Sequence, residues 1–344
     1  MRNLSIFLKL THRCNLKCKY CYDAQLIKKT GQDIDINNVK KIIKLASKYF
    51  KNISLFFHGG EPLIMPVSFY EEINQYAKSL NIGVRYSMTS NGTLVNEEWI
   101  DLIKRLKLSY AVSYDGLSSD HYRCDHEIIA DKIKLLLSKN INVGLVSVGN
   151  EIFLDNIINE YEHIKSLGVK HFRINELFGD GIDNEYTQKY IKSMCKLFDY
   201  WIKDQNRIEI FQFKQILKML TGQSASGALC TNCHDHWIGM DNDGLLGLCD
   251  FGAFPRELNF GYLDDYDDFG DILYCKERLE LLKQVSKRLE QCYLSGCELA
   301  GKCSGGCNAH FYREFKSLDK INGQHCEIYR KLIVYISNKF QKNK

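Results

Sequence analysis

Short apolar runs alternate with longer amphipathic stretches through the first half of the chain. The apolar runs are rich in β-branched and aromatic residues and predict strands at residues 4–10, 53–58, 84–89, 108–114, 143–148 and 171–175. Between them, apolar residues recur at helical spacing and predict helices at residues 39–49, 69–80, 97–106, 128–139 and 154–167. A strand–helix alternation repeated about six times favours an α/β fold with a parallel sheet. Right-handed units of this kind form either a barrel or a doubly wound layer, and the pattern alone leaves both open.

The second half of the chain follows a different pattern. A further helix is predicted at residues 185–204, and a cysteine-rich region begins after a run of small residues. We therefore place a domain boundary near Gly222, which divides the chain into residues 1–222 and 223–344. The last segment, 327–344, alternates apolar and basic residues at helical spacing and is expected to be a capping helix.

Composition and charge narrow the class of protein. The chain has 344 residues, of which 45% are hydrophobic and 26% charged, as in ordinary globular proteins. Its formal charge of +4 is too balanced to indicate a nucleic-acid partner. No apolar run approaches the ~20 residues needed to span a bilayer, and the first residues lack a secretory pattern. We expect a cytoplasmic protein with no membrane or nucleic-acid partner.

The cysteines are too numerous and too clustered to be ordinary core residues. Of 14 cysteines, three crowd near the N-terminus, and eight others, apart from Cys275, fall between Cys230 and Cys326. A chain without an export signal is not expected to pair them as disulfides. Only Cys124, Cys195 and Cys275 stand apart, and we interpret these as ordinary thiols. The other eleven are then metal ligands, in groups of three, four and four.

The N-terminal group has the spacing C-x3-C-x2-C, formed by Cys14, Cys18 and Cys21, with Tyr20 just before the last cysteine. Three thiolates can hold three irons of a [4Fe–4S] cluster and leave the fourth iron open, whereas structural zinc sites normally use four ligands. A zinc site or unrelated thiols remain the alternatives. The motif resembles that of the radical S-adenosylmethionine (radical SAM) superfamily. The resemblance implies a partial (β/α)6 barrel whose open iron binds SAM, and cleavage of SAM to a 5′-deoxyadenosyl radical.

Further motifs lie at the carboxyl ends of the predicted strands, where parallel α/β folds place functional residues. Gly59-Gly60-Glu61-Pro62 follows the second strand and resembles the superfamily motif that holds the amino group of SAM. The two glycines allow close approach of backbone, and Glu61 supplies an acceptor for an ammonium group. The alternative is a simple turn.

The third and fourth strands end in Thr-Ser-Asn-Gly-Thr and Ser-Tyr-Asp-Gly segments, which resemble two other SAM-binding segments of the superfamily. By resemblance, Ser90, Asn91 and Ser113 hydrogen-bond the ribose and carboxylate of SAM. Asn-Gly and Asp-Gly are also strong turn formers, so strand-end turns are the alternative. Arg123 matches a basic position of the superfamily loosely and pairs either with a carboxylate of SAM or in a surface ion pair.

The C-terminal cysteines resemble the SPASM domain, an extension of radical SAM enzymes with two auxiliary [4Fe–4S] clusters. The resemblance implies one cluster on Cys230, Cys233, Cys249 and Cys307, and the other on Cys292, Cys297, Cys303 and Cys326. With the N-terminal cluster this makes three. The spacing from Cys292 to Cys297 is x4 where x2 is usual, so this turn is expected to differ, and Cys233 is the least secure ligand. Two zinc ribbons would explain the same number of cysteines.

Asp250, directly after Cys249, is the best candidate for proton chemistry. Beside an auxiliary cluster, this carboxylate could deprotonate a substrate while the cluster accepts an electron. Anaerobic sulfatase-maturating enzymes of the superfamily carry an Asp at this place. The alternative is a turn residue that hydrogen-bonds local backbone.

The resemblance implies an enzyme that acts on a peptide or protein side chain and takes electrons from a flavodoxin or ferredoxin. Our main hypothesis is cross-linking of a ribosomally made peptide through a thioether or carbon–carbon bond. Because the first strand begins at about Leu4, we expect no leader-binding domain before it, so that a leader peptide would bind either a separate protein or the barrel directly. The alternative is sulfatase maturation, which oxidises Cys or Ser to formylglycine. It is supported by Asp250, although His58 stands where those enzymes commonly have Gln. A non-catalytic iron–sulfur electron carrier is the third hypothesis, but it would not need SAM-binding motifs.

Overall fold

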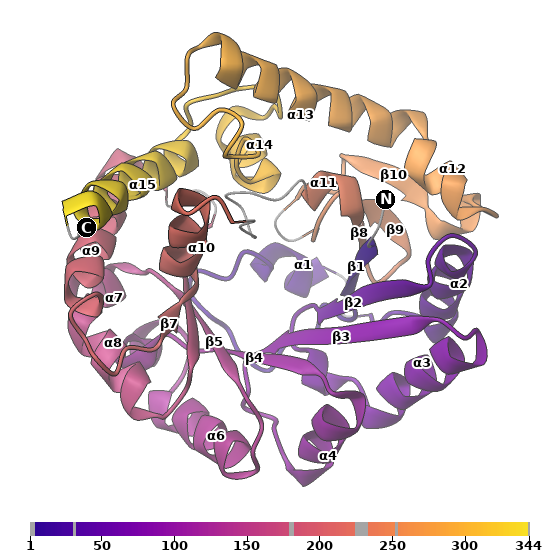
Figure 1. The fold of residues 1–344 in the computed structure, drawn as a ribbon. Helices are drawn as coiled ribbons and strands as arrows, with labels where there is room; N and C mark the ends of the chain where they lie inside the picture. Colours follow the sequence, from indigo (N-terminus) through magenta and orange to yellow (C-terminus); the bar gives the residue numbers. More distant parts are fainter. Residues whose placement is uncertain (1–3, 30–31, 179–181, 224–232, 252–253, 343–344) are drawn as a thin grey trace. The chain divides into compact units, whose positions relative to one another are not determined.

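The computed structural model describes residues 4–29, 32–178, 182–223, 233–251 and 254–342 (Figure 1). The chain divides into two compact units, each of which is described by itself. Unit 1 comprises Met1–Val112, Ser138–Ile141 and Cys233–Leu282. Unit 2 comprises Ser113–Leu137, Asn142–Asn232 and Lys283–Lys344. The two units are defined by how compactly the chain packs, not by sequence position. The predicted domain boundary near Gly222 therefore stays a prediction.

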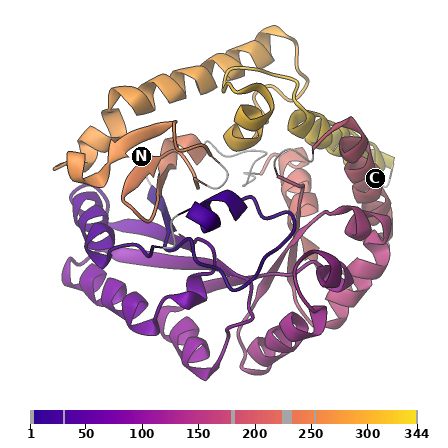
Figure 2. The same ribbon diagram turned by 180° about the vertical axis from the view of Figure 1, so that it is seen from behind.

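Unit 1 is built on parallel strands that alternate with helices. The strands are β1 (Leu4–Lys9), β2 (Asn52–His58), β3 (Gly83–Ser90) and β4 (Ser109–Ser113), and each pairs in parallel with the next. The connecting helices are α1 (Ala24–Lys29), α2 (Ile36–Ser47), α3 (Val67–Ser79) and α4 (Glu97–Leu106). Figure 1 and Figure 2 show α2, α3 and α4 along one side of these strands. The predicted alternation of strands and helices is therefore confirmed in this part of the chain.

The C-terminal part of unit 1 extends the same sheet, which the sequence did not predict. Strand β8 (Trp237–Met240) pairs in parallel with β1, and β9 (Leu245–Gly247) and β10 (Asn259–Tyr262) continue antiparallel. The remaining helices of this part are α11 (Cys233–His236) and α12 (Phe269–Tyr274). Because β8 lies beside β1, residues that follow β9 are brought next to the N-terminal strand.

Unit 2 contains the remaining parallel strands and the C-terminal helices. Strand β6 (His171–Asn175) pairs in parallel with β5 (Gly144–Val148) and with β7 (Glu209–Ile210). Its helices are α5 (Ser119–Tyr122), α6 (His126–Ser138), α7 (Glu151–Asp155), α8 (Ile157–Ser166), α9 (Asn184–Trp201), α10 (Phe211–Leu220), α14 (Asn308–Phe315) and α15 (Gln324–Lys342). Helix α13 (Lys276–Leu294), which the sequence did not predict, begins in unit 1 and ends in unit 2. Helix α15 packs along α9, so the predicted C-terminal helix is confirmed.

Local sequence explains why these elements form where they do. In β1, Leu4, Ile6 and Leu8 alternate inward and are fully buried, as a strand with one core face requires. Helix α4 begins at Asn96, whose side chain accepts a hydrogen bond from the Trp99 backbone N–H at 3.0 Å. Within the described residues, no helix is both long and apolar enough to cross a bilayer.

Candidate active site and cysteine pocket

The N-terminal cysteines lie in the loop that follows β1. The backbone N–H of Cys21 donates to the carbonyl of Cys18 at 3.2 Å, and the Leu16 N–H approaches the Cys14 sulfur at 3.4 Å. Burial raises the pKa of both Cys14 and Cys21 to about 11, and the charges of neighbouring cysteines in the triplet add to this effect. The three thiols therefore sit close enough to interact and would be stabilised as thiolates by bound iron. This donor set fits three irons of a [4Fe–4S] cluster.

The two glycines after β2 are required by a close backbone contact with this loop. A Cβ atom on Gly59, whose φ is +142°, would lie 2.4 Å from the Thr11 carbonyl oxygen. A Cβ atom on Gly60 would lie 2.2 Å from the Arg13 carbonyl oxygen, and the Gly60 N–H donates to Thr11 at 2.8 Å. The glycines therefore let the loop after β2 pack against the backbone that leads into Cys14.

Glu61 ties the ends of two neighbouring strands together. Its fully buried carboxylate accepts hydrogen bonds from the Leu63 N–H at 2.9 Å, the Ser90 hydroxyl at 2.8 Å and the Asn91 N–H at 2.7 Å. Burial raises the pKa of Glu61 to about 7, although these three donors oppose the shift. A carboxylate offers about four lone-pair sites, so one remains for a further N–H donor.

Asn91 connects the end of β3 to the cysteine loop. Its amide nitrogen donates to the Asn15 side chain at 2.8 Å and lies 4.0 Å from the Cys14 sulfur. Its amide oxygen accepts from the Thr93 N–H at 3.0 Å, which fixes the orientation of the amide. The structure thus brings Ser90 and Asn91 together with the loop of Cys14. Tyr20 lies in the same loop and is half-buried.

Two residues predicted to bind SAM belong to unit 2. Ser113 is the last residue of β4. The Arg123 Nε donates to Asp115 at 2.9 Å, and the other oxygen of this buried carboxylate accepts the Val148 N–H at 2.8 Å. Arg123 therefore takes part in an ion pair inside unit 2, and the roles of Ser113 and Arg123 toward SAM stay predictions.

Asp250 lies in a buried charged cluster that the sequence analysis missed. The ammonium group of Lys9, at the end of β1, lies 2.6 Å from Asp250 and 2.6 Å from Asp23. Burial lowers the pKa of Lys9, but the charges of the two carboxylates outweigh it and hold this pKa well above its ordinary value. Burial raises the pKa of Asp23 to about 6 despite Lys9. The sequence did contain one signal for this cluster, because the charged Lys9 lies between Leu8 and Leu10 in a largely apolar strand.

Tyr22 and His58 adjoin this charged cluster. The Tyr22 hydroxyl lies 3.4 Å from the His58 Nε2, and burial lowers the pKa of His58 to about 4, so its imidazole is neutral near pH 7. Burial, together with Asp250 and Asp23, holds the pKa of the Tyr22 phenol well above its ordinary range. The cluster is therefore a buried set of proton acceptors and donors beside the N-terminal cysteine loop.

The close packing of β8 on the chain near Asp250 explains how this residue reaches β1. A Cβ atom on Gly239, in β8, would lie 2.0 Å from the carbonyl oxygen of Cys249. Only a glycine at this position allows the segment of Cys249 and Asp250 to lie directly on the strand that pairs with β1.

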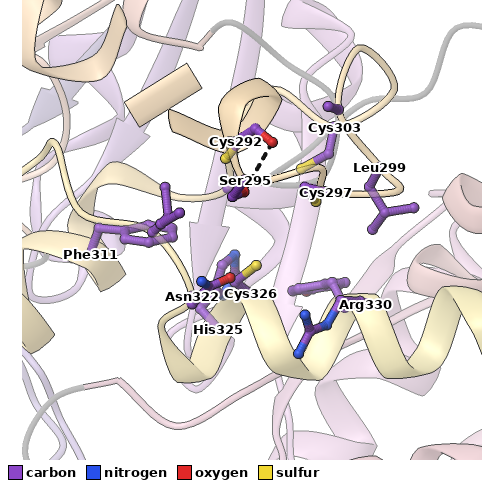
Figure 3. Close-up of a pocket in the computed structure, with 15 residues that line it drawn as sticks. Cys292, Ser295, Cys297, Leu299, Cys303, Phe311, Asn322, His325, Cys326 and Arg330 are labelled. Atoms are coloured by element: carbon purple, nitrogen blue, oxygen red, sulfur yellow. Dashed lines mark hydrogen bonds between the residues drawn. The ribbon is translucent and has the colours of Figure 1, made fainter. Parts of the chain in front are cut away.

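A second group of cysteines surrounds one pocket in unit 2 (Figure 3). The four cysteines that line it are Cys292, Cys297, Cys303 and Cys326. Burial raises the pKa of Cys326 to about 11, and the charges of the other three cysteines contribute to the shift. These are the four residues predicted from the sequence to hold one auxiliary cluster, and a cavity lined by four thiols fits a cluster with all its irons ligated by protein.

Two glycine-containing turns shape this pocket. Cys292 lies near the end of α13, and Gly296, with a φ of +70°, closes the turn so that the Cys297 N–H donates to the Cys292 carbonyl at 3.1 Å. This turn accommodates the x4 spacing. Burial raises the pKa of Cys303, while hydrogen bonds from the backbone N–H groups of Gly305 and Gly306 oppose this shift. The glycines therefore let amides approach the sulfur.

A buried network of acid and imidazole groups anchors the helix that carries Cys326. Glu176, directly after β6, lies 2.6 Å from the His325 Nδ1 and 3.3 Å from the His310 Nε2. The two imidazole rings stack with centroids 4.5 Å apart, and the Tyr329 hydroxyl donates to Glu176 at 3.3 Å. This network connects the end of β6 to the start of α15, and no motif in the sequence indicated it.

The ligands predicted for the other auxiliary cluster are divided between the two units or lie outside the described residues. Cys307 caps the N-terminus of α14, where its sulfur accepts hydrogen bonds from the backbone of Ala309 and His310. Cys249 lies after β9 in unit 1 and is half-buried. Cys230 and the side chain of Cys233 lie outside the described residues. The second auxiliary cluster therefore stays a prediction.

Comparison with known proteins identifies the class. The radical SAM superfamily profile matches residues 8–174. The cysteine-type anaerobic sulfatase-maturating enzyme of Clostridium novyi (strain NT) is 27% identical over 295 residues, which cover 77% of this chain and 78% of that enzyme. The subtilosin biosynthesis protein AlbA of Bacillus subtilis (strain 168) is 26% identical and covers 87% of this chain and 66% of AlbA.

A solved structure shares the fold over almost the whole chain. The structure of anSMEcpe with bound AdoMet superposes with a TM-score of 0.86 at 22% identity, covering 99% of this chain and 98% of that one. The chain contains a radical SAM domain at residues 8–174 and is an enzyme. The predicted α/β fold class is confirmed, and the superfamily implies one [4Fe–4S] cluster and SAM.

Proposed function

We propose that this enzyme matures a sulfatase-type protein by oxidising a Cys or Ser side chain to formylglycine. The observation that carries the proposal is the buried Asp250 held by Lys9, in a chain similar to a sulfatase-maturating enzyme over most of its length. The comparisons thus favour the alternative weighed from the sequence over our main hypothesis of peptide cross-linking.

The N-terminal site would hold the radical-generating cofactors. Cys14, Cys18 and Cys21 would ligate one [4Fe–4S] cluster, which with SAM supplies a 5′-deoxyadenosyl radical that removes a hydrogen atom from the substrate Cβ. Glu61 has a lone-pair site for the amino group of SAM, and Asn91 reaches toward the cysteine loop. The other residues proposed for the SAM pocket are Tyr20, Gly59, Gly60, Ser90, Ser113 and Arg123.

Asp250 is suited to the proton transfer that follows. After hydrogen abstraction, the substrate radical must lose one proton and one electron to become a thioaldehyde or aldehyde. A thioaldehyde then exchanges sulfur for oxygen with water and releases hydrogen sulfide. A carboxylate can accept this proton, and the Lys9 ammonium, 2.6 Å from Asp250, holds the carboxylate in place. The protonated Tyr22 phenol supplies a hydrogen-bond donor in the same cluster.

The remaining electron needs an iron–sulfur acceptor, a role for which we propose the C-terminal cysteines. One auxiliary cluster would use Cys292, Cys297, Cys303 and Cys326, which line one pocket. The other would use Cys230, Cys233, Cys249 and Cys307. We propose three clusters in total, a SPASM domain at residues 223–344, a flavodoxin or ferredoxin as electron donor, and a cytoplasmic location.

The direct test uses peptides that carry the modified residue of a cysteine-type or a serine-type sulfatase. The reconstituted enzyme, with SAM and reductant, should convert one of them to a formylglycine peptide, detected by mass spectrometry and by reaction with a hydrazide probe. A matched peptide with Ala at the target position is the control. Cleavage of SAM without change in either sulfatase peptide would overturn the proposal.

Peptide cross-linking is the second candidate, because AlbA, a bacteriocin biosynthesis protein, is similar over 87% of this chain. In this case the substrate is a Cys-bearing precursor peptide, and a separate leader-binding protein is expected. A product that loses two hydrogen atoms and resists fragmentation between the linked residues would support it. Neither product is expected from a non-catalytic electron carrier, which would consume no SAM.

A further inference from the structure

Arg288 places a fixed positive charge inside unit 2, and nothing in the proposed function uses it. The residue lies on α13 and is fully buried. One terminal nitrogen of its guanidinium donates to the Leu318 carbonyl at 2.7 Å, and the other donates to the Asn308 amide oxygen at 2.5 Å. These bonds hold the guanidinium in one orientation. Because arginine is always protonated in proteins, this buried charge is permanent.

The charge lies directly behind the wall of the cysteine pocket. A Cβ atom on Gly305 would lie 3.3 Å from the Arg288 Nε, so the guanidinium packs against the turn that joins Cys303 to Cys307. Its central carbon lies 4.5 Å from the ring centre of Phe311, which lines the same pocket. Gly305, with a φ of +83°, is the residue that allows this approach.

Gly305 and Phe311 both line the cysteine pocket, so the guanidinium that packs on them lies next to any cluster held there. A cluster ligated by four thiolates carries net negative charge and becomes more negative when it accepts an electron. A nearby permanent cation in a buried site therefore stabilises the reduced form more than the oxidised form.

We propose that Arg288 is a positioning residue that raises the reduction potential of the cluster held by Cys292, Cys297, Cys303 and Cys326. The inference rests on the proposed function, because it requires a cluster at this pocket. In that function the cluster must accept an electron from the oxidised substrate. Arg288 would make this acceptor more easily reduced without touching substrate, SAM or iron.

Arg330 provides a matched comparison in the same pocket. It lines the pocket from α15 and is only half-buried, and its charge also opposes the burial effect on the pKa of Cys326 (Figure 3). Water and salt screen an exposed charge more strongly than a buried one. Loss of the Arg330 charge should therefore change the cluster potential less than loss of the Arg288 charge.

The test is a potentiometric titration of the full-length reconstituted protein, followed by electron paramagnetic resonance. The reduction step that disappears from the titration of Cys303→Ala belongs to the cluster held in this pocket. For this transition, Arg288→Gln and Arg288→Met should lower the equilibrium constant for reduction about tenfold, which corresponds to 59 mV for a one-electron couple. Arg288→Lys, which keeps the charge, and Arg330→Gln should each give a clearly smaller shift.

The outcomes separate this inference from the proposed function. An unchanged potential in both neutral variants, or equal shifts in Arg288→Lys and Arg288→Gln, would overturn the role of the charge. If both neutral variants lose the cluster while Arg288→Lys retains it, the charge serves to hold the cluster rather than to set its potential, and the inference fails. If Arg288→Lys loses it too, the side chain acts through packing and the inference fails. If Cys303→Ala removes neither iron nor any transition, the auxiliary cluster of the proposed function is itself absent.

Discussion

The two cysteine sites differ in the number of their ligands and in what surrounds them. In unit 1, three cysteines share a short loop with polar neighbours, and the Asn91 amide lies 4.0 Å from Cys14. In unit 2, four cysteines line a pocket together with Leu299, Phe311 and Tyr329. A site with three thiols and polar neighbours suits a cluster that also binds a polar molecule. A site with four thiols can ligate every iron of a cluster, which suits a cluster that only exchanges electrons, although Asn322 and Arg330 also line this pocket.

The two sites also differ in how the chain builds them. The three-cysteine loop depends on the neighbouring strand end, because Gly59 and Gly60 pack on its backbone. The four-cysteine pocket depends on two turns and on helix α15, which brings Cys326 to the others. Substitutions in one site should therefore leave the other intact, and the following predictions test this independence.

The largest effect is expected when the three-cysteine site is removed. Replacement of Cys14, Cys18 and Cys21 together by Ala should abolish formation of 5′-deoxyadenosine, because only a cluster with an open iron can bind SAM. Iron at the four-cysteine pocket should remain. The measurement is chromatography of the reaction with reductant, together with an iron assay. Residual 5′-deoxyadenosine from the triple variant would contradict the assignment.

Substitution of Asp250→Asn should separate radical formation from product formation. Asn keeps the size of the side chain but cannot act as a base, and a general base contributes ~10²–10⁴ in rate. We therefore expect product formation to fall by about this factor while SAM is still cleaved. The measurement compares modified peptide with 5′-deoxyadenosine in the same reaction.

Asp23→Asn is the matched control, since Asp23 also lies 2.6 Å from Lys9. If the two carboxylates served only to balance the charge of Lys9, both variants would lose product equally. If Asp250→Asn formed product at the rate of the unmodified enzyme, Asp250 would have only a structural role.

Removal of one ligand from the four-cysteine pocket should lower the iron content of the protein but leave SAM cleavage intact. If three clusters are present, reconstituted protein binds about twelve irons per chain. Cys303→Ala should then lose about a third of them and still cleave SAM. Cys124→Ala, in a thiol predicted to be no ligand, is the control. Unmodified protein that saturates near four irons, with zinc in the remaining sites, would show that the C-terminal cysteines hold no clusters.

The smallest effect is expected at the glycine contact. In Gly60→Ala the new Cβ would meet backbone, the Arg13 carbonyl oxygen at 2.2 Å, and overpacking of this kind costs about 1–3 kcal/mol in the free energy of unfolding. In Gly83→Ala the new Cβ would meet the Asn52 side-chain oxygen at 2.2 Å, which can move away. Denaturant unfolding of both variants should therefore show the larger loss in Gly60→Ala, and equal losses would argue against a rigid contact.

Much of this enzyme is determined by local sequence. Apolar periodicity predicted the six strands β1 to β6 and the longer helices α2, α3, α4, α6 and α8 between them, since alternation and helical spacing are properties of short segments. The short helices α1, α5 and α7 were not predicted. The resemblance to the SPASM domain indicated the four residues that share the pocket in unit 2, whereas spacing alone would have favoured Cys307 over the more distant Cys326. The strand-end motifs likewise predicted that Ser90 and Asn91 lie beside the loop of Cys14.

Only the tertiary structure decided which charges meet. Lys9 and Asp250 are separated by 241 positions in the chain and come together because β8 pairs with β1 and Gly239 lets the Cys249 backbone lie on it. Strand β8 has only four residues, too few to give a periodic signal. The burial of Arg288 behind the Gly305 turn is equally absent from local pattern, since α13 carries many charged residues and nothing in its sequence distinguishes Arg278 and Arg288, which are buried, from the others. Such pairings depend on which segments pack together, and no short stretch of sequence contains that information.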